Sequence, residues 1–503
     1  MKLGTLSGID VVIVFVYLIG MMWFGIRIGR FIKTDKDYFL GGRKLPWWAI
    51  GMSMVVSDIG ALDIVGVAGT AYLYGIAMAN FEWIGCIPAM IIGAFIFIPF
   101  YWRTGVFTIP EFLGRRYNQF VRTVVALIVG IFMAFLLGVF LYTAAKAINI
   151  LIGWPEYASI LGVAAVVGVY TLFGGLAAVV YTDAIQCVIM FVGSAIILII
   201  ALIKIGGWGE LVTAVTAMGD QYSNHFELLL PVDSPTPYGW AGILFGLSFV
   251  LSPAYWLGNQ AIVQRTLGAK SEYEAKKSVL WGAFLKLFIP IILVGPGLAG
   301  IVLHPGLESS DDIYPTLIHD MLPPGLTGLV FAAFLAALMS SVDSYLNSAA
   351  TLWTKDIYQA IFVPDKSDRH YMLVGKTFIG IFLVLGVIVA PIAGKFPTIY
   401  GYFQTVFSIF QGPLLAIIGL GLLWPRATGI GASFGLVLGV MTSSTLFWMK
   451  DLIFSTSEPF LYIAWWAFIA ALFITVAVSL MTKPDYSKHR MVSRGTAHWE
   501  DKR

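Results

Sequence analysis

The chain alternates long apolar stretches with short polar loops, and only 12% of its 503 residues are charged. Soluble domains average about 25% charged residues, and 59% of this chain is hydrophobic with a mean hydropathy of +0.85. Crossing roughly 30 Å of hydrocarbon takes about 20 helical residues. The pattern predicts an all-α polytopic membrane protein with about 13 transmembrane helices, near residues 8–29, 45–72, 77–102, 123–148, 156–175, 178–204, 240–262, 278–303, 324–352, 372–394, 400–424, 427–448 and 459–481.

The basic residues predict the orientation of these helices. One alternating set of loops, together with the C-terminal tail, holds 25 of the 31 Lys and Arg residues, and Lys286 lies inside a helix. The other set holds five, namely Lys2, Lys146, Lys204, Lys395 and Lys450. Because basic loops stay in the cytoplasm, we expect a multi-pass protein of the cell membrane with its N-terminus outside and its tail inside. The first apolar stretch lacks a small-residue cleavage site and is expected to be a retained helix.

Two cysteines, Cys86 and Cys187, lie within apolar runs, which favours small buried hydrophobes over a disulfide or metal site. The string from Gly295 to Gly300 fits GxGxxG, but it closes an apolar span and follows no predicted strand. No Walker-type phosphate loop, nucleophile–base constellation or nucleic-acid-binding pattern is present in the sequence. These observations argue against an ATP-driven pump, an enzyme and a nucleic-acid partner.

Seven charged residues are placed inside apolar segments, where a charge costs about 3 kcal/mol or more and faces a cavity, a partner or an ion path. Lys146 is near enough to a helix end to snorkel, and Asp183 at a helix start could be a cap. Lys286 is in mid-segment, so we expect it to pair with a buried carboxylate or a solute. The seven are Asp58, Asp63, Glu82, Lys146, Asp183, Lys286 and Asp343.

Two segments that are five apart look interrupted. The second contains small and acidic residues from Val56 to Asp63, and the seventh contains Pro253, which removes a backbone donor. Broken helices at corresponding positions of two halves are typical of inverted-repeat transporters and mark their binding site. A proline kink beside an unrelated polar patch is the alternative.

A face of small and hydroxyl residues follows in the ninth segment. It is formed by Ala337, Ser340, Ser341 and Ser344, which share one side of a helix. Hard cations prefer oxygen ligands, which such hydroxyls and the carbonyls of an unwound helix supply. Close helix packing is the alternative explanation.

Ordered sequence matches between about Asp37 and Trp424 make the chain resemble the sodium/solute symporter family, in its sodium/sugar (galactose/glucose) branch. The matching strings are Asp37–Arg43, Leu45–Ala49, Thr108–Phe112, Gly174–Asp183, Gln264–Leu267 and Leu346–Thr351. The resemblance implies a LeuT-like five-plus-five inverted repeat in helices two to eleven. We therefore expect a first helix and cytoplasmic loop (1–44), a first repeat (45–204), an extracellular loop (205–239), a second repeat (240–424), two peripheral helices (425–482) and a cytoplasmic tail (483–503).

The resemblance also implies two ion sites. The main sodium site would use carbonyls of Val56, Ile59 and Ala337 and the hydroxyls of Ser340 and Ser341. Asp58 would assist sodium binding or gating rather than touch the solute. A second cation site would combine Ser340 with Asp183, Asp343 and Ser344. Since two close carboxylates do not both ionise without a cation or shared proton, we expect this site to bind a second sodium ion or a proton.

The solute pocket transfers with changes. Glu82, Lys286 and Gln404 match the family's galactose pocket, Tyr255 matches its inner gate, and Phe81 replaces an outer tyrosine. Asp63 stands in place of Gln, and Ser252 in place of Asn.

The resemblance implies alternating-access symport of sodium with a sugar or polyol, and it requires no cofactor and no oligomer. A carboxylic-acid solute is less favoured, because the fourth helix lacks the arginine of the sialic acid branch. Symport of proline-like amino acids or another organic solute, proton coupling and a transporter-like sensor remain alternatives.

Overall fold

The computed structural model describes residues 6–234, 236–393, 399–456 and 458–494. The described residues are nearly all helical, with two isolated β-bridges and short 3₁₀ and π turns between helices. The helices are α1 Gly8–Gly29, α2 Asp35–Leu40, α3 Trp47–Asp58, α4 Ala61–Tyr74, α5 Ile87–Ile92, α6 Ile98–Thr104, α7 Ile109–Arg116, α8 Gln119–Ile152, α9 Glu156–Ile205, α10 Trp208–Thr216, α11 Ser252–Gly258, α12 Gln260–Leu267, α13 Glu272–Lys286, α14 Ile289–Leu303, α15 Ile313–Met321, α16 Leu326–Leu352, α17 Asp368–Ala393, α18 Ile399–Leu423, α19 Gly429–Trp448, α20 Lys450–Ile453, α21 Phe460–Met481 and α22 Tyr486–Arg494.

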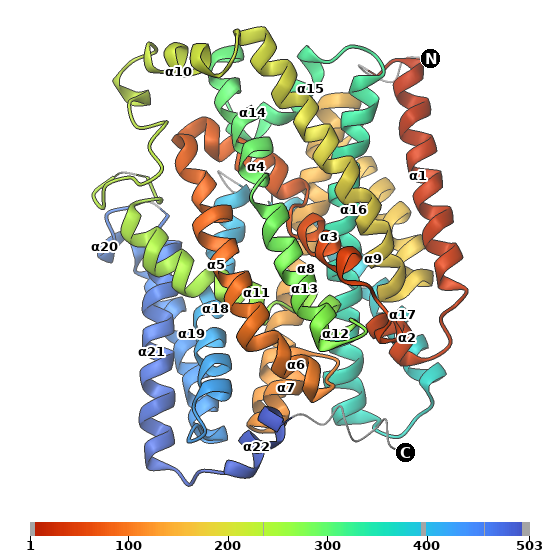
Figure 1. Cartoon of the computed structure of the whole chain (residues 1–503), viewed down its shortest axis with the longest axis vertical. Helices are drawn as coiled ribbons and strands as arrows, with labels where there is room; N and C mark the ends of the chain where they lie inside the picture. Colours follow the sequence, from red (N-terminus) through yellow and green to blue (C-terminus); the bar gives the residue numbers. More distant parts are fainter. Residues whose placement is uncertain (1–5, 235, 394–398, 457, 495–503) are drawn as a thin grey trace.

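Long helices run side by side through the molecule (Figure 1). Helix α3 packs against α9, α13 and α16, while α19 and α21 pack on each other and on α18. The pair α19 and α21 stands at one edge of the view and α1 at the opposite edge. Within the described ranges ten helices are long and apolar enough to cross a membrane, and two shorter apolar helices accompany them. The all-helical membrane architecture is confirmed, whereas the count of 13 crossings stays a prediction.

The predicted interruption of the second segment is confirmed. Helix α3 ends at Asp58 and α4 begins at Ala61, with Ile59 (φ −88°, ψ 79°) and Gly60 (φ −83°, ψ −177°) between them. The carboxylate of Asp63 accepts a 3.0 Å hydrogen bond from the Gly60 amide and so caps the start of α4. A Cβ on Gly60 would lie 2.4 Å from the hydroxyl oxygen of Ser341. Glycine therefore lets the unwound backbone approach α16.

The seventh segment is interrupted later than Pro253. Its first part, Gly242–Leu251, is π-helical, and Pro253 lies in the first turn of α11, where a missing N–H costs little. The backbone leaves the helix at Asn259 (φ −75°, ψ 115°), whose side-chain oxygen accepts a 2.9 Å bond from the Ala261 amide and caps α12. The break is therefore made by the asparagine cap, six residues beyond the predicted position.

The fifth and sixth predicted segments are joined as α9, with a kink at Gly175 (φ 52°, ψ −170°). A Cβ there would lie 2.7 Å from the carbonyl oxygen of Tyr38, and L side chains rarely adopt this φ. Asp183 lies eight residues beyond the kink, in the helix interior. It is therefore no helix cap.

Candidate functional site

The break between α3 and α4 faces the serine pair of α16. The Ser341 hydroxyl donates to the Ser57 carbonyl at 3.1 Å, and the hydroxyl oxygens of Ser340 and Ser57 lie 2.9 Å apart. Both α16 serines are buried, as is Ala337 one turn earlier. Among the described residues no backbone amide outside helical bonding donates to the Val56 or Ile59 carbonyl. The structure thus turns the Ser340 and Ser341 hydroxyls toward α3 beside the break. The use of Val56, Ile59, Ala337 and these two serines as sodium ligands stays a prediction.

A buried charge network lies one turn away. The Asp183 carboxylate accepts from Ser53 (2.6 Å) and Ser57 (3.0 Å) and forms an ion pair of 3.3 Å with Arg265. The guanidinium also donates to Ser53 at 2.6 Å, to Ser57 at 2.6 Å, and to Ser344. The Asp343 carboxylate accepts a 3.1 Å bond from the Ser344 hydroxyl. Asp183, Ser340 and Ser344 therefore gather around Ser57, and Asp343 joins them through Ser344.

Arg265 is the residue of this network that the sequence interpretation missed. By the sequence alone, Arg265 counts among the basic residues of a loop. In the structure it is 1% exposed and lies on α12, which packs against α3 and α16. The break at Asn259 redirects the chain without taking it out of the protein, so the residues after it remain inside. The guanidinium of Arg265 gives Asp183 a positive partner within the protein. The second cation or proton site with Asp343 stays a prediction. The position of Arg265 within the matching string Gln264–Leu267 was the sequence signal that could have identified it as a buried functional residue.

Lys286 lies between two carboxylates at the end of α13. Its ammonium pairs with Asp58 and, at 2.5 Å, with Glu82, and it lies 5.6 Å from the ring centroid of Trp256. The expected pairing of this lysine is confirmed. Lys146, by contrast, lies nearer solvent and pairs with Asp312 at 2.8 Å.

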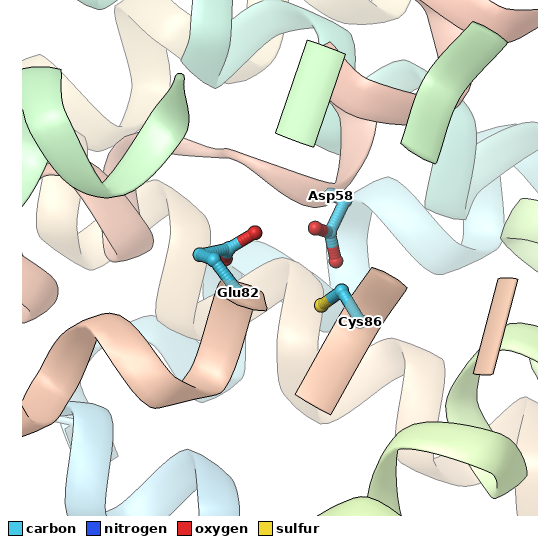
Figure 2. Close-up of side chains that lie close together, drawn as sticks. All are labelled: Asp58, Glu82 and Cys86. Carbon is cyan, nitrogen blue, oxygen red and sulfur yellow. The ribbon is translucent and has the colours of Figure 1, made fainter. Parts of the chain in front are cut away.

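Figure 2 shows the carboxylates of Asp58 and Glu82 and the thiol of Cys86 directed toward one another. These ligand atoms lie within 4.8 Å of each other, which is a spacing that a metal ion could use. However, the Lys286 ammonium already pairs with both carboxylates. The Lys286 ammonium therefore occupies the place that a metal ion would take between these carboxylates. Both cysteines are buried free thiols, as expected.

Beside this cluster lies a cavity of about 60 Å³. This volume has room for a few water molecules, so a solute of sugar size requires the pocket to widen. Asp58, which was expected to act away from the solute, lines the cavity too. The predicted solute residues that line it are Asp63, Phe81, Glu82, Ser252, Tyr255 and Gln404.

One face of α18 completes the cavity and was largely missed by the sequence interpretation. Tyr400, Phe403, Phe407 and Gln411 line it together with Gln404, whose amide donates to the Tyr400 hydroxyl at 2.8 Å. Their spacing of three or four residues is the signal that could have found them. The ring centroids of Phe403 and Phe407 are 4.6 Å apart, so this wall is a packed aromatic surface.

Comparisons with known proteins find relatives over most of the chain. The chain is 35% identical to the sodium/glucose cotransporter of Vibrio parahaemolyticus, over 86% of this chain and 84% of that protein. It is 34% identical to sodium/myo-inositol cotransporter 2 of Oryctolagus cuniculus, over 87% of this chain and 69% of that protein.

Among solved structures, a substrate-bound, outward-open sodium-coupled sialic acid symporter matches with a TM-score of 0.83 and 23% identity, over 95% of this chain and 99% of that chain. The nucleobase-cation-symport-1 family transporter Mhp1 matches with a TM-score of 0.60 and 14% identity, over 90% and 97% of the two chains. These likenesses establish the LeuT-like inverted-repeat fold. The family model described as "Sodium:solute symporter family" matches residues 38–439, and the chain therefore belongs to this family.

Proposed function

We propose that this protein couples the inward movement of sodium to the uptake of a sugar or polyol by alternating access. The single observation that carries the proposal is the placement of a polar, aromatic-lined cavity directly beside buried oxygens from an unwound helix and a facing serine pair. Relatives that are named for glucose or myo-inositol cotransport support this choice of solute.

In this proposal the main sodium ion binds between the α3–α4 break and α16. Carbonyls of Val56, Ile59 and Ala337 and the hydroxyls of Ser340 and Ser341 are its ligands. Five oxygens without a carboxylate suit a monovalent ion that must be released in every cycle. Asp58 lies one residue before the break, and its charge assists the ion while pairing with Lys286.

The second cation site is centred on Asp343 and Ser344, next to Asp183. Asp183 forms an ion pair with Arg265, and Asp343 is linked to the same network through Ser344. Two carboxylates in one buried network favour the binding of an additional sodium ion or a proton. Loading of this site would stiffen the contact of α16 with α3 and α9, because Ser57, Ser344 and Asp183 belong to these three helices.

The solute binds in the cavity between α4, η3 (Glu82–Cys86), η6 (Gly242–Leu251) and α18. Asp63, Glu82, Ser252 and Gln404 bond its hydroxyl groups, and Lys286 fixes the orientation of Glu82. Phe81 and Tyr255 are the outer and inner aromatic gates. The Phe81 ring contacts Tyr238 and Tyr400 at centroid distances of 5.7 and 5.8 Å, and the Tyr255 ring lies 5.7 Å from Phe407.

Transport would proceed in a fixed order across the cell membrane, with the N-terminus outside and the tail in the cytoplasm. Sodium orders α3 and α16, the solute then closes the outer gate, and both are released inward. One charge moving through 100 mV supplies about 2.3 kcal/mol, and a tenfold sodium gradient adds about 1.4 kcal/mol. Each sodium ion can therefore sustain roughly 500-fold accumulation of solute.

The test is uptake of radiolabelled glucose and myo-inositol into proteoliposomes that contain the purified protein. We expect uptake with an inward sodium gradient and none with an equal potassium gradient. Proline serves as the amino-acid competitor, and a proton gradient without sodium tests proton coupling. Competition by proline but by neither sugar nor polyol, or uptake that follows pH and ignores sodium, would overturn the proposal.

A further inference from the structure

The carboxylates around the solute cavity outnumber its cations. Asp58, Asp63 and Glu82 line the cavity, and Lys286, paired with two of them, is the one Lys or Arg that contacts this group among the described residues. Asp63 forms no ion pair with any part of the chain that the structure describes. The pocket therefore carries a formal surplus of two negative charges, of which a sodium ion at the α3–α4 break would balance one.

Asp63 is held so that one of its oxygens is available to a ligand. Its Oδ2 accepts from the Gly60 amide at 3.0 Å, and its Oδ1 accepts from none of the described donors. The residue lies in the first turn of α4, where the helix dipole favours a negative charge. The Gly60 amide and the start of α4 therefore favour the carboxylate form of Asp63, whereas burial and the charges of Asp58 and Glu82 oppose it. A cationic ligand beside Asp63 would relieve this repulsion.

Two neutral polar side chains on the cavity wall are also available to form hydrogen bonds with a ligand. Gln411 is 3% exposed and Ser252 is 6% exposed, and neither has a hydrogen bond to a described residue. Buried amides and hydroxyls are normally bonded. These two, on opposite elements α18 and α11, are placed to bond hydroxyl groups of a solute.

The remaining wall has the chemistry of an ammonium site. Trp256 lines the cavity and already has the Lys286 ammonium 5.6 Å from its ring centroid. Tyr255, Tyr400, Phe403 and Phe407 add further aromatic rings. Aromatic faces attract ammonium groups, most strongly where water is excluded. A carboxylate surplus against such a wall favours a cation over a neutral solute.

We infer that the solute is a hydroxylated organic cation of sugar size, such as an amino sugar, whose ammonium binds Asp63 and the aromatic wall while its hydroxyls bind Ser252, Gln404 and Gln411. This inference rests on the proposed sugar or polyol symport and narrows its substrate class. Asp63 is the specificity-determining residue, since it is the carboxylate of the pocket that Lys286 does not pair with.

The test compares the uptake of three matched hexoses into proteoliposomes under an inward sodium gradient, at a pH where the amine is protonated. D-Glucosamine differs from D-glucose by an ammonium in place of one hydroxyl, and N-acetyl-D-glucosamine carries the same nitrogen without the charge. We expect glucosamine to reach half-maximal uptake at a concentration at least tenfold lower than glucose does, and N-acetylglucosamine to show no such preference.

Variants locate the preference. Asp63→Gln should reduce the glucosamine-to-glucose ratio to less than twofold, and Asp63→Glu should retain most of it. Asp451→Asn removes a carboxylate from the exposed helix α20 and should leave the ratio unchanged. If Asp63→Gln does not fold, as judged by size-exclusion chromatography, the wild-type comparison and Asp63→Glu still decide.

Two failures are distinguishable. Sodium-driven glucose uptake that equals or exceeds glucosamine uptake overturns this inference and leaves the proposed function standing. Absence of sodium-driven uptake for all three hexoses and for myo-inositol overturns both. A retained preference in Asp63→Gln refutes the role of Asp63.

Discussion

Replacing Gly60 with alanine is expected to weaken sodium binding without changing the backbone of the α3–α4 break. Gly60 has φ −83° and ψ −177°, which any L residue adopts, so the substitution introduces no backbone strain. The added methyl would, however, lie 2.4 Å from the Ser341 hydroxyl oxygen and 3.1 Å from its Cβ. An ordinary contact needs nearly 1 Å more, so the hydroxyl must rotate away from the break.

The magnitude follows from the loss of one ligand. A hydrogen bond or contact to a charged partner contributes about 1.5 to 3 kcal/mol, and 1.4 kcal/mol corresponds to a factor of ten. We therefore expect the sodium concentration for half-maximal uptake to rise at least tenfold in Gly60→Ala, with the solute affinity at saturating sodium much less affected.

The assay is solute uptake into proteoliposomes as a function of external sodium, with potassium keeping the ionic strength constant. Gly380→Ala is the matched control, because a Cβ on Gly380 in α17 would meet no atom within 4 Å. Ser341→Ala should raise the sodium requirement by a similar factor, and the double variant should add little to either single change, since both remove the same hydroxyl. A sodium requirement in Gly60→Ala within twofold of wild type would refute the reasoning.

Three further predictions concern the buried charges and one loop. Lys286→Met leaves two carboxylates facing each other and should lower the free energy of unfolding by about 3 to 5 kcal/mol; thermal unfolding in detergent measures this, and failure of Glu82→Gln to recover part of the loss would contradict it. Asp343→Asn should change the sodium Hill coefficient or the pH profile of uptake, and the hypothesis of a second cation site fails if both stay the same. Burial lowers the pKa of His225 below the usual 6.5 of histidine, so the packing of its loop is complete above that pH and weakens as the pH falls. Hydrogen exchange of residues 220–230, corrected for intrinsic rates, should accelerate as the pH falls below 6.5 in wild type and not in His225→Gln; equal acceleration in both would exclude this histidine as the cause.

Local sequence determined which segments are helical, that they span a membrane, and where the helix is interrupted between α3 and α4. Apolar runs of about 20 residues can bury themselves in lipid only as helices, whatever lies beside them. Gly60 and the polar residues around it interrupt such a run, so the position of the unwound segment was readable from the chain. Lys286 in mid-segment required a buried partner for the same energetic reason.

Tertiary structure decided which groups meet. Hydropathy cannot predict that Lys286 from α13 pairs with Asp58 from α3 and Glu82 from η3, because each carboxylate is more than 200 positions from the lysine in the sequence. Nor could it place Arg265, which looks like a loop charge until the chain turns at Asn259 and carries it inside. The cost of burying a guanidinium is met by Asp183 and three serines that come from α3, α9 and α16. Charge pairing is a property of distances in space, and only the packing of these helices sets those distances.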